Sequence, residues 1–125
     1  TMNIEAKTML AMTKQQIVPA VIKFQKNLAE TIFFIYKTTG DSVVSDDLLR
    51  NVTKHLNEVK KALDELQKVT DTAKTLPEGK EKAVYYRDKV TTAMAALRTP
   101  VDQLEMIVDR DIWPMPTYAD LIFEV

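Results

Sequence analysis

Cysteine is absent from this chain of 125 residues, and glycine and histidine are scarce. Without cysteine there is neither a disulfide framework nor a thiolate metal site, which is compatible with a reducing compartment. Two glycines are too few for a loop that cradles phosphate through backbone N–H groups. The single histidine, His55, lacks the Glu-x-x-His spacing of di-metal carboxylate bundles, because Val52 stands three residues before it. We therefore expect His55 to be an exposed or boundary residue of a helix.

An excess of one charge and long apolar runs are also lacking. The formal net charge is −1, and basic and acidic residues are interleaved rather than gathered into a basic stripe. The longest apolar run, Ile32–Tyr36, is far shorter than the roughly 20 residues of a membrane span. The first residues, Thr1–Glu5, show no basic start and no cleavage pattern of a secretory signal. We therefore expect no nucleic-acid partner, no membrane partner and a cytoplasmic location.

The chain does have the apolar spacing of long helices. A first helix is predicted from about Ile4 to Thr38, with a broad apolar face of the kind that packs against two neighbours. Pro19 lies inside it and is expected to kink the helix near residues 15–19. Gly40 is expected to end it as a left-handed cap. The apolar positions are Leu10, Ile17, Val21, Phe24, Leu28, Ile32 and Ile35, with a flanking stripe of Met9, Val18, Ile22, Phe33 and Tyr36.

A second helix is predicted from an N-cap at Ser45 to about Ala73. Asp46 and Asp47 would lie in its first turn, where the helix dipole favours negative charge. Its apolar residues alternate in steps of three and four, which is typical of coiled-coil-like packing. These residues are Leu49, Val52, Leu56, Val59, Leu63 and Leu66.

A third helix is predicted from about Lys80 to Asp109. Pro100 interrupts it, and the sequence leaves two outcomes open. Either Thr99 caps a new helix with Pro100 at its first position, or one helix continues with a bend. Its apolar seam is formed by Val90, Met94, Leu97, Val101, Leu104 and Val108.

These elements predict an all-α fold. Short connections make successive helices antiparallel neighbours, and thirty residues of helix measure roughly 45 Å. We expect residues 1–111 to form an elongated up-down-up bundle of three long antiparallel helices, with a kink of the first helix at Pro19. Helical spacing is already running at Ile4, so we expect the chain to be a piece of a longer protein.

The last fourteen residues, 112–125, are predicted to be an extended, proline-rich apolar tail. Two prolines one residue apart prevent helix and hold the chain extended. Near the end, either Thr117 caps a short helical turn with Asp120, or residues 121–125 add a strand to another sheet. An apolar tail of this kind needs a groove to dock into. The candidate docking residues are Trp113, Pro114, Pro116, Tyr118, Leu121, Ile122 and Phe123.

Other residues receive weaker functional interpretations. The six methionines are scattered over two helices and the tail, which favours core filling over a binding face. Of Tyr85 and Tyr86, at most one can point fully into the core, so the other is a candidate interface residue. No nucleophile is paired with a base. The sequence therefore offers no catalytic, cofactor-binding or metal-binding residue.

The tail resembles the carboxyl end of type III glutamine synthetases. In that family a Trp-Pro-x-Pro-Thr-Tyr segment precedes a short apolar finish, which matches Trp113–Phe123. The start of the chain, with Ile4–Ala6, Met9 and Gln16–Val21, is similar to the helix that follows the catalytic barrel in that family, and Leu104-Glu105 also fits. The resemblance thus brackets the whole chain, in the expected order.

The resemblance implies a structural role within a larger enzyme. The parent would join ammonia to glutamate in the cytoplasm, using ATP and Mg²⁺ or Mn²⁺, and would assemble as stacked hexameric rings. The family's metal, nucleotide, glutamate and ammonia contacts lie upstream, so this fragment is expected to need no cofactor and to be inert alone. Its partners would be the rest of the parent chain and neighbouring subunits. The alternative is a free-standing helical-bundle module that binds a partner protein.

Overall fold

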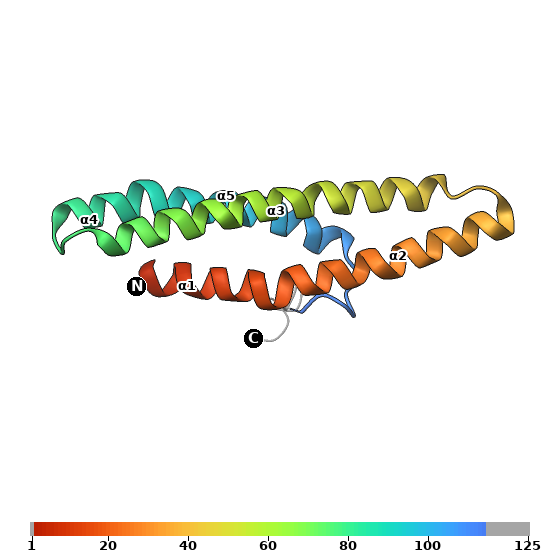
Figure 1. Ribbon diagram of the computed structural model, residues 1–125, viewed down its shortest axis with the longest axis horizontal. Helices are drawn as coiled ribbons and strands as arrows, with labels where there is room; N and C mark the ends of the chain where they lie inside the picture. The colour runs from red at the N-terminus through yellow and green to blue at the C-terminus, as the bar shows by residue number, and fades with distance from the viewer. Residues whose placement is uncertain (1, 115–125) are drawn as a thin grey trace, which may run out of the picture.

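Three helical rods lie side by side in the computed structural model, which describes residues 2–114 (Figure 1). Consecutive rods run in opposite directions, and all regular elements of this part of the chain are helical. The predicted all-α class is therefore confirmed for these residues, while the tail beyond Pro114 lies outside them. The first rod consists of α1 (Met2–Met12), η1 (Thr13–Ile17) and α2 (Val18–Thr39), the second of α3 (Val43–Thr75), and the third of α4 (Lys80–Tyr85), η2 (Tyr86–Val90) and α5 (Thr91–Ile107).

The kink expected near Pro19 takes the form of a π-helical turn. In η1 the N–H of Val18 donates to the carbonyl of Thr13, five residues earlier. Pro19 has no N–H, and its ring would crowd the carbonyl four residues before it in a regular α-helix. The extra residue in the π turn gives the ring room without ending the helix, so the first rod runs on to Thr39.

Gly40 ends the first rod as the sequence predicts. Its φ is 75° and its ψ is 5°, and its N–H donates to the carbonyl of Tyr36 at 2.8 Å. This left-handed conformation carries little cost for glycine, because no Cβ meets the neighbouring carbonyl. The chain turns here toward α3.

The predicted N-cap at Ser45 is wrong. α3 begins at Val43, with Ser42 at the cap position. The reason lies in Asp41, whose carboxylate accepts a hydrogen bond from the N–H of Val43 at 3.0 Å. Asp41 thus satisfies an otherwise unpaired donor of the first turn earlier than expected. Asp46 nevertheless lies in the first turn, as predicted.

The structure decides between the two outcomes left open at Pro100. α5 runs through this residue without interruption and buries it. Thr99 is not a cap, because its hydroxyl donates to the carbonyl of Ala95 at 3.3 Å, one turn earlier in the same helix. The third rod is therefore one helix, with a π-helical segment, η2, ahead of α5.

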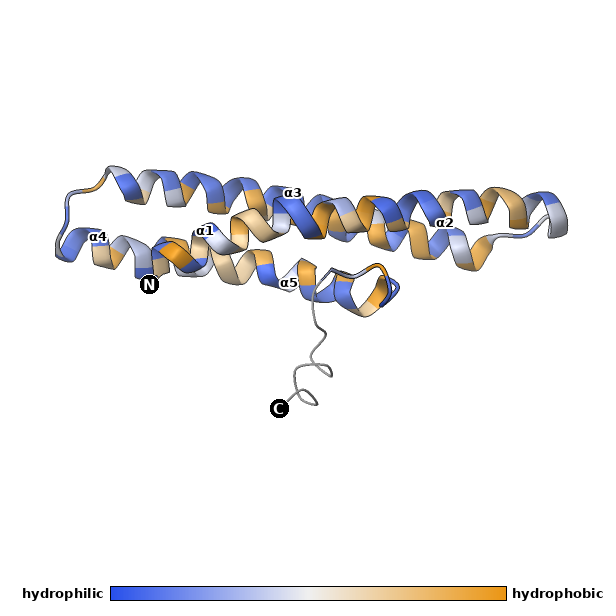
Figure 2. Cartoon of the chain, turned by 90° about the horizontal axis from the view of Figure 1, so that it is seen from below, coloured by the Kyte–Doolittle hydropathy of each residue, from blue (hydrophilic) through white to orange (hydrophobic). Residues whose placement is uncertain are grey.

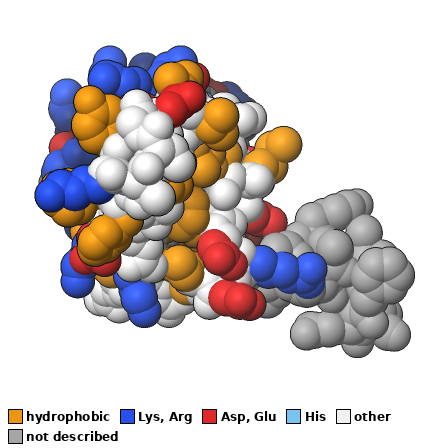
Figure 3. All heavy atoms as spheres, turned by 90° about the vertical axis from the view of Figure 1, so that its right-hand side faces the viewer, with side chains coloured by type: hydrophobic (Ala, Val, Ile, Leu, Met, Phe, Trp, Pro, Cys, Tyr) orange, Lys and Arg blue, Asp and Glu red, His pale blue; other side chains and the backbone are white. Residues whose placement is uncertain are grey.

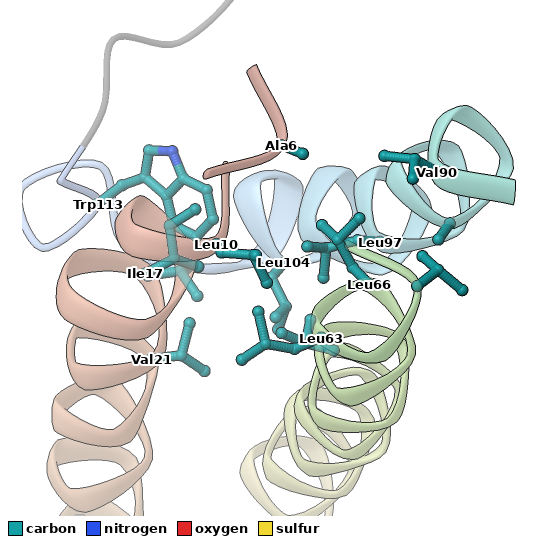
Figure 4. Packing of buried hydrophobic residues seen from close by; sticks show 14 of the residues in the cluster. Ala6, Leu10, Ile17, Val21, Leu63, Leu66, Val90, Leu97, Leu104 and Trp113 are labelled. Atoms are coloured by element: carbon teal, nitrogen blue, oxygen red, sulfur yellow. The ribbon is translucent and has the colours of Figure 1, made fainter. Parts of the chain in front are cut away.

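The core lies where the three rods run together (Figure 4). α3 supplies its central seam, which α1 and α2 cover from one side and η2 and α5 from another. Within the predicted seams, Leu49, Leu56, Met94 and Val101 are only partly buried. The fully enclosed residues include Ala6, Val21, Val52, Val59, Leu66, Ala73, Val90, Leu97 and Leu104.

Beyond the end of α5, the molecule continues as two helices only (Figures 1 and 2). The distal hairpin, residues 22–56, consists of most of α2 and the first part of α3. Gln25 and Thr53 join its helices through a side-chain hydrogen bond of 3.0 Å. The last buried residue of α2 is Val21, so the outer part of this hairpin lacks the enclosure that three rods provide elsewhere.

Replacing Leu97 with alanine should lower the free energy of unfolding by about 2–5 kcal/mol, because Leu97 is fully enclosed and the change leaves a cavity. Met106→Ala is a matched control on the same helix, since that side chain is 81% exposed, and it should change stability by less than about 0.5 kcal/mol. Urea denaturation followed by circular dichroism measures both. Similar losses in the two variants would contradict the described core.

A candidate docking site around Trp113

A turn centred on Asp109 reverses the chain after α5. The backbone N–H groups of Ile112 and Trp113 donate to the carbonyl of Asp109 at 2.9 and 3.0 Å. The carboxylate of Asp109 also accepts from the N–H of Asp111 at 2.9 Å. Asp109 therefore organises the turn that leads Trp113 back onto the first rod.

Trp113 is packed into the core. Its side chain is only 7% exposed, and Figure 4 shows the indole lying against Leu10 and Ile17 of the first rod. The beginning of the predicted tail is therefore in contact with the bundle, and the following residue, Pro114, is exposed. The single tryptophan of the chain joins the end of the third rod to the middle of the first.

A groove between α1 and α5 lies beside Trp113. Its volume is about 550 Å³, and the indole forms part of its wall. The apolar part of the lining comes mainly from Ile4, Met9, Met12, Met94 and Val101, and the charged part from Glu5, Arg98, Asp102 and Glu105. An apolar lining with a few charged groups is typical of a surface that binds another apolar segment.

Among residues 2–114, the indole N–H of Trp113 finds no hydrogen-bond acceptor, although its nitrogen is buried. A buried donor without an acceptor costs about 1–3 kcal/mol.

Of the remaining candidate residues, two lie within the described part of the chain and five lie outside it. Tyr85 and Tyr86 are both partly buried against the core, and the hydroxyl of Tyr86 donates to Asn3 at 3.2 Å. Tyr86 therefore joins the start of the first rod to the third. The docking candidates that lie outside the described residues stay predictions: Pro116, Tyr118, Leu121, Ile122 and Phe123.

His55 is a boundary residue on α3. Its Nδ1 lies 2.6 Å from a carboxylate oxygen of Glu58, one turn later on the same helix. Between residues 2 and 114, no three His, Asp or Glu side chains are grouped as metal ligands would be. Within the same residues, every helix is too short or too polar to cross a membrane. The groove beside Trp113 is therefore the feature of this region that points most directly to binding.

The described residues define an all-α scaffold that carries an apolar groove next to its C-terminal segment. The family to which its sequence is similar is glutamine synthetase, and residues 1–35 match the model of the glutamine synthetase C-terminal domain. Three curated relatives extend the similarity over nearly the whole chain. The glutamine synthetase of Bacteroides fragilis is 27% identical over 97% of this chain, and that of Butyrivibrio fibrisolvens is 27% identical over 100%. The type-3 glutamine synthetase of Dictyostelium discoideum is 26% identical over 98%.

These matches agree with the resemblance carried by the tail and by the first helix. The chain is similar to the C-terminal region of type III glutamine synthetases along nearly all of its length. It spans less than a fifth of the length of these relatives, namely 17% of the protein from Bacteroides and 18% of the other two.

Replacing Trp113 with alanine should lower the free energy of unfolding by about 3 kcal/mol. This value is at the lower end for a buried tryptophan, because the change also removes an unpaired N–H. Trp113→Phe should cost less, since it keeps most of the apolar contact and also removes the donor. Urea denaturation followed by circular dichroism measures both variants. A stability unchanged in Trp113→Ala would show that the indole does not anchor the chain end.

Proposed function

We propose that this chain is the C-terminal helical part of a type III glutamine synthetase and that its role is structural. It would pack on the catalytic part of the parent and contribute to contacts between subunits. The observation that carries this proposal is the pattern of coverage. Relatives named glutamine synthetase match 97–100% of this chain but only 17–18% of their own length. Such coverage favours a part of a larger protein over the alternative of a free-standing interaction module.

In this proposal the reaction takes place elsewhere in the parent. The parent would join ammonia to glutamate with ATP and Mg²⁺ or Mn²⁺, in the cytoplasm and in stacked hexameric rings. The described residues do not fit a divalent metal site, because they bring no three carboxylate or imidazole groups together. Hard divalent cations require several such oxygen ligands at once. We therefore derive no chemical step from these residues and assign them to assembly.

We further propose that residues 112–125 act as a docking segment with Trp113 as its first anchor. The buried indole and the groove beside it support this role. Each large apolar side chain of the tail would contribute on the order of 1.5–3 kcal/mol when well buried, less the cost of ordering the segment.

Truncating the full-length parent after Arg110 should abolish most ring assembly and, with it, synthetase activity. This truncation removes both the Trp113 anchor and the segment that follows it. Size-exclusion chromatography with light scattering measures the assembly, and glutamine formation from glutamate, ammonia and ATP measures the activity.

A second truncation, after Pro114, provides the control. It keeps Trp113 and removes only the later residues, so it separates the contribution of the anchor from that of the tail. We expect this variant to keep the folded helical part while losing the tail contacts. If the Arg110 truncation leaves rings and activity unchanged, the proposed assembly role is wrong.

A further inference from the structure

The groove beside Trp113 runs along the first rod. Its lining reaches from Ile17, next to the indole, to Ile4 near the start of α1. At about 1.5 Å of rise per residue, these two positions lie roughly 20 Å apart along the helix. Ile4 is 61% exposed. The described residues therefore close one end of the groove with Trp113 and leave a large apolar side chain uncovered at the other.

The lining of the groove suits apolar side chains of irregular shape. Met9, Met12 and Met94 form part of it and are partly buried against the core. Methionine is unbranched and polarizable, so it adapts to the shape of its neighbour. The volume of about 550 Å³ is within the range of sites that enclose apolar groups. The groove therefore fits an occupant that presents several apolar side chains together.

We propose that the end of the same chain, residues 117–125, fills this groove by folding back against α1 and α5. This inference rests on the docking role proposed above for residues 112–125, and it deepens that role by naming the docking surface. The contact is then made within one chain. The apolar residues that would enter the groove are Tyr118, Leu121, Ile122 and Phe123.

Covalent attachment favours this occupant. The turn at Asp109 brings Trp113 into the wall of the groove, so the tail begins at the groove itself. A short tether gives an effective concentration of about the millimolar range. A segment from another subunit, or from a remote part of the parent, would have to displace the tail against this advantage.

The length of the tail agrees with the length of the groove. Leu121 comes eight residues after Trp113. A chain of this length spans at most about 28 Å when it is extended and about 12 Å when it is helical. The roughly 20 Å between the two ends of the groove lies between these limits. The apolar residues of the tail can therefore reach the uncovered side chain of Ile4.

Apolar burial, rather than charge, would hold the tail in the groove. The tail has two acidic residues, Asp120 and Glu124, and no basic one. Among the described lining residues, three are acidic and Arg98 is the one base. Like charges oppose association, so the binding free energy has to come from the apolar side chains. A charge placed on the apolar lining of the groove should therefore oppose docking.

The distal hairpin, residues 22–56, is a less suitable surface for the tail. It also exposes apolar side chains, and Figure 3 shows some of them among charged ones at that end of the molecule. It lies beyond the end of α5, however, whereas Trp113 is held against Leu10 and Ile17 in the part where three rods run together. The groove already contains the anchor of the tail.

Methionine methyl resonances test the contact in this chain directly. Truncation after Pro114 should shift the resonances of the three groove methionines, because it removes the aromatic rings of the tail from their surroundings. The Met106 resonance is an internal control and should move less, since Met106 is not part of the lining. The shifts of the intact chain should not change on dilution, because the contact is made within one chain. The groove methionines are Met9, Met12 and Met94.

A charge at the far end of the groove should release the tail without unfolding the bundle. Ile4→Glu changes a side chain that is already 61% exposed, but the tail would have to cover the new carboxylate with apolar groups. Chymotrypsin cleavage after the aromatic residues of the tail should become at least about tenfold faster, because cleavage follows the population of the released state. Met106→Glu is the matched control, since Met106 is 81% exposed and lies outside the lining. Circular dichroism should show that both variants remain helical.

The proposal is overturned if truncation after Pro114 leaves the groove methionines unmoved, or if Ile4→Glu and Met106→Glu are cleaved at the same rate. It is also overturned if the methyl shifts change on dilution while light scattering shows dimers, because the tail then fills the groove of another copy. None of these measurements uses the parent enzyme. Loss of ring assembly in the parent truncated after Arg110, together with unmoved groove methionines, would reject this inference and keep the proposed function.

Discussion

Burial of the apolar seam of α3 is the interaction on which the rest of the structure depends. α3 is the only rod that contacts each of the other two along most of the described bundle, and its seam is enclosed from Val52 to Ala73. The surface ion pairs, such as the one between Lys60 and Asp64, are solvent-exposed and contribute little by comparison. Helices of this length gain most of their stability from packing of an apolar face. The first and third rods are therefore held in place mainly by their contacts with α3.

The unequal lengths of the rods give the two ends of the molecule different properties. Where α5 is present, three apolar faces enclose one another and large side chains such as Leu97 are fully buried. Where α5 is absent, α2 and α3 cover only the side chains that face each other, and most of these are partly buried. The flanking stripe of α2 then stays exposed, although its spacing is that of a packed seam. The broad apolar face of the first rod is thus packed against its neighbours where α5 is present. Further along, where α5 is absent, part of the same face stays exposed.

Much of this architecture follows from the sequence because the apolar residues of each helix recur at regular helical spacing. The three rods, the left-handed Gly40 and most core residues were predictable for that reason. The start of α3 was not, since Asp41 and Ser45 both have side chains that can cap a helix and only the turn geometry selects Asp41. The groove beside Trp113 was also not predictable in detail. It needs Ile4, Met9 and Met94, which are far apart in the sequence, to meet at one place.

The two prolines inside helices show how context decides the response to the same residue. Pro19 lies next to a π turn, whereas α5 passes through Pro100 without one. Pro19 is exposed, while Pro100 is buried, and burial of its ring helps to offset the missing hydrogen bond. A proline in a helix of this fold is therefore tolerated by two means, either by a local change of helix type or by tertiary packing.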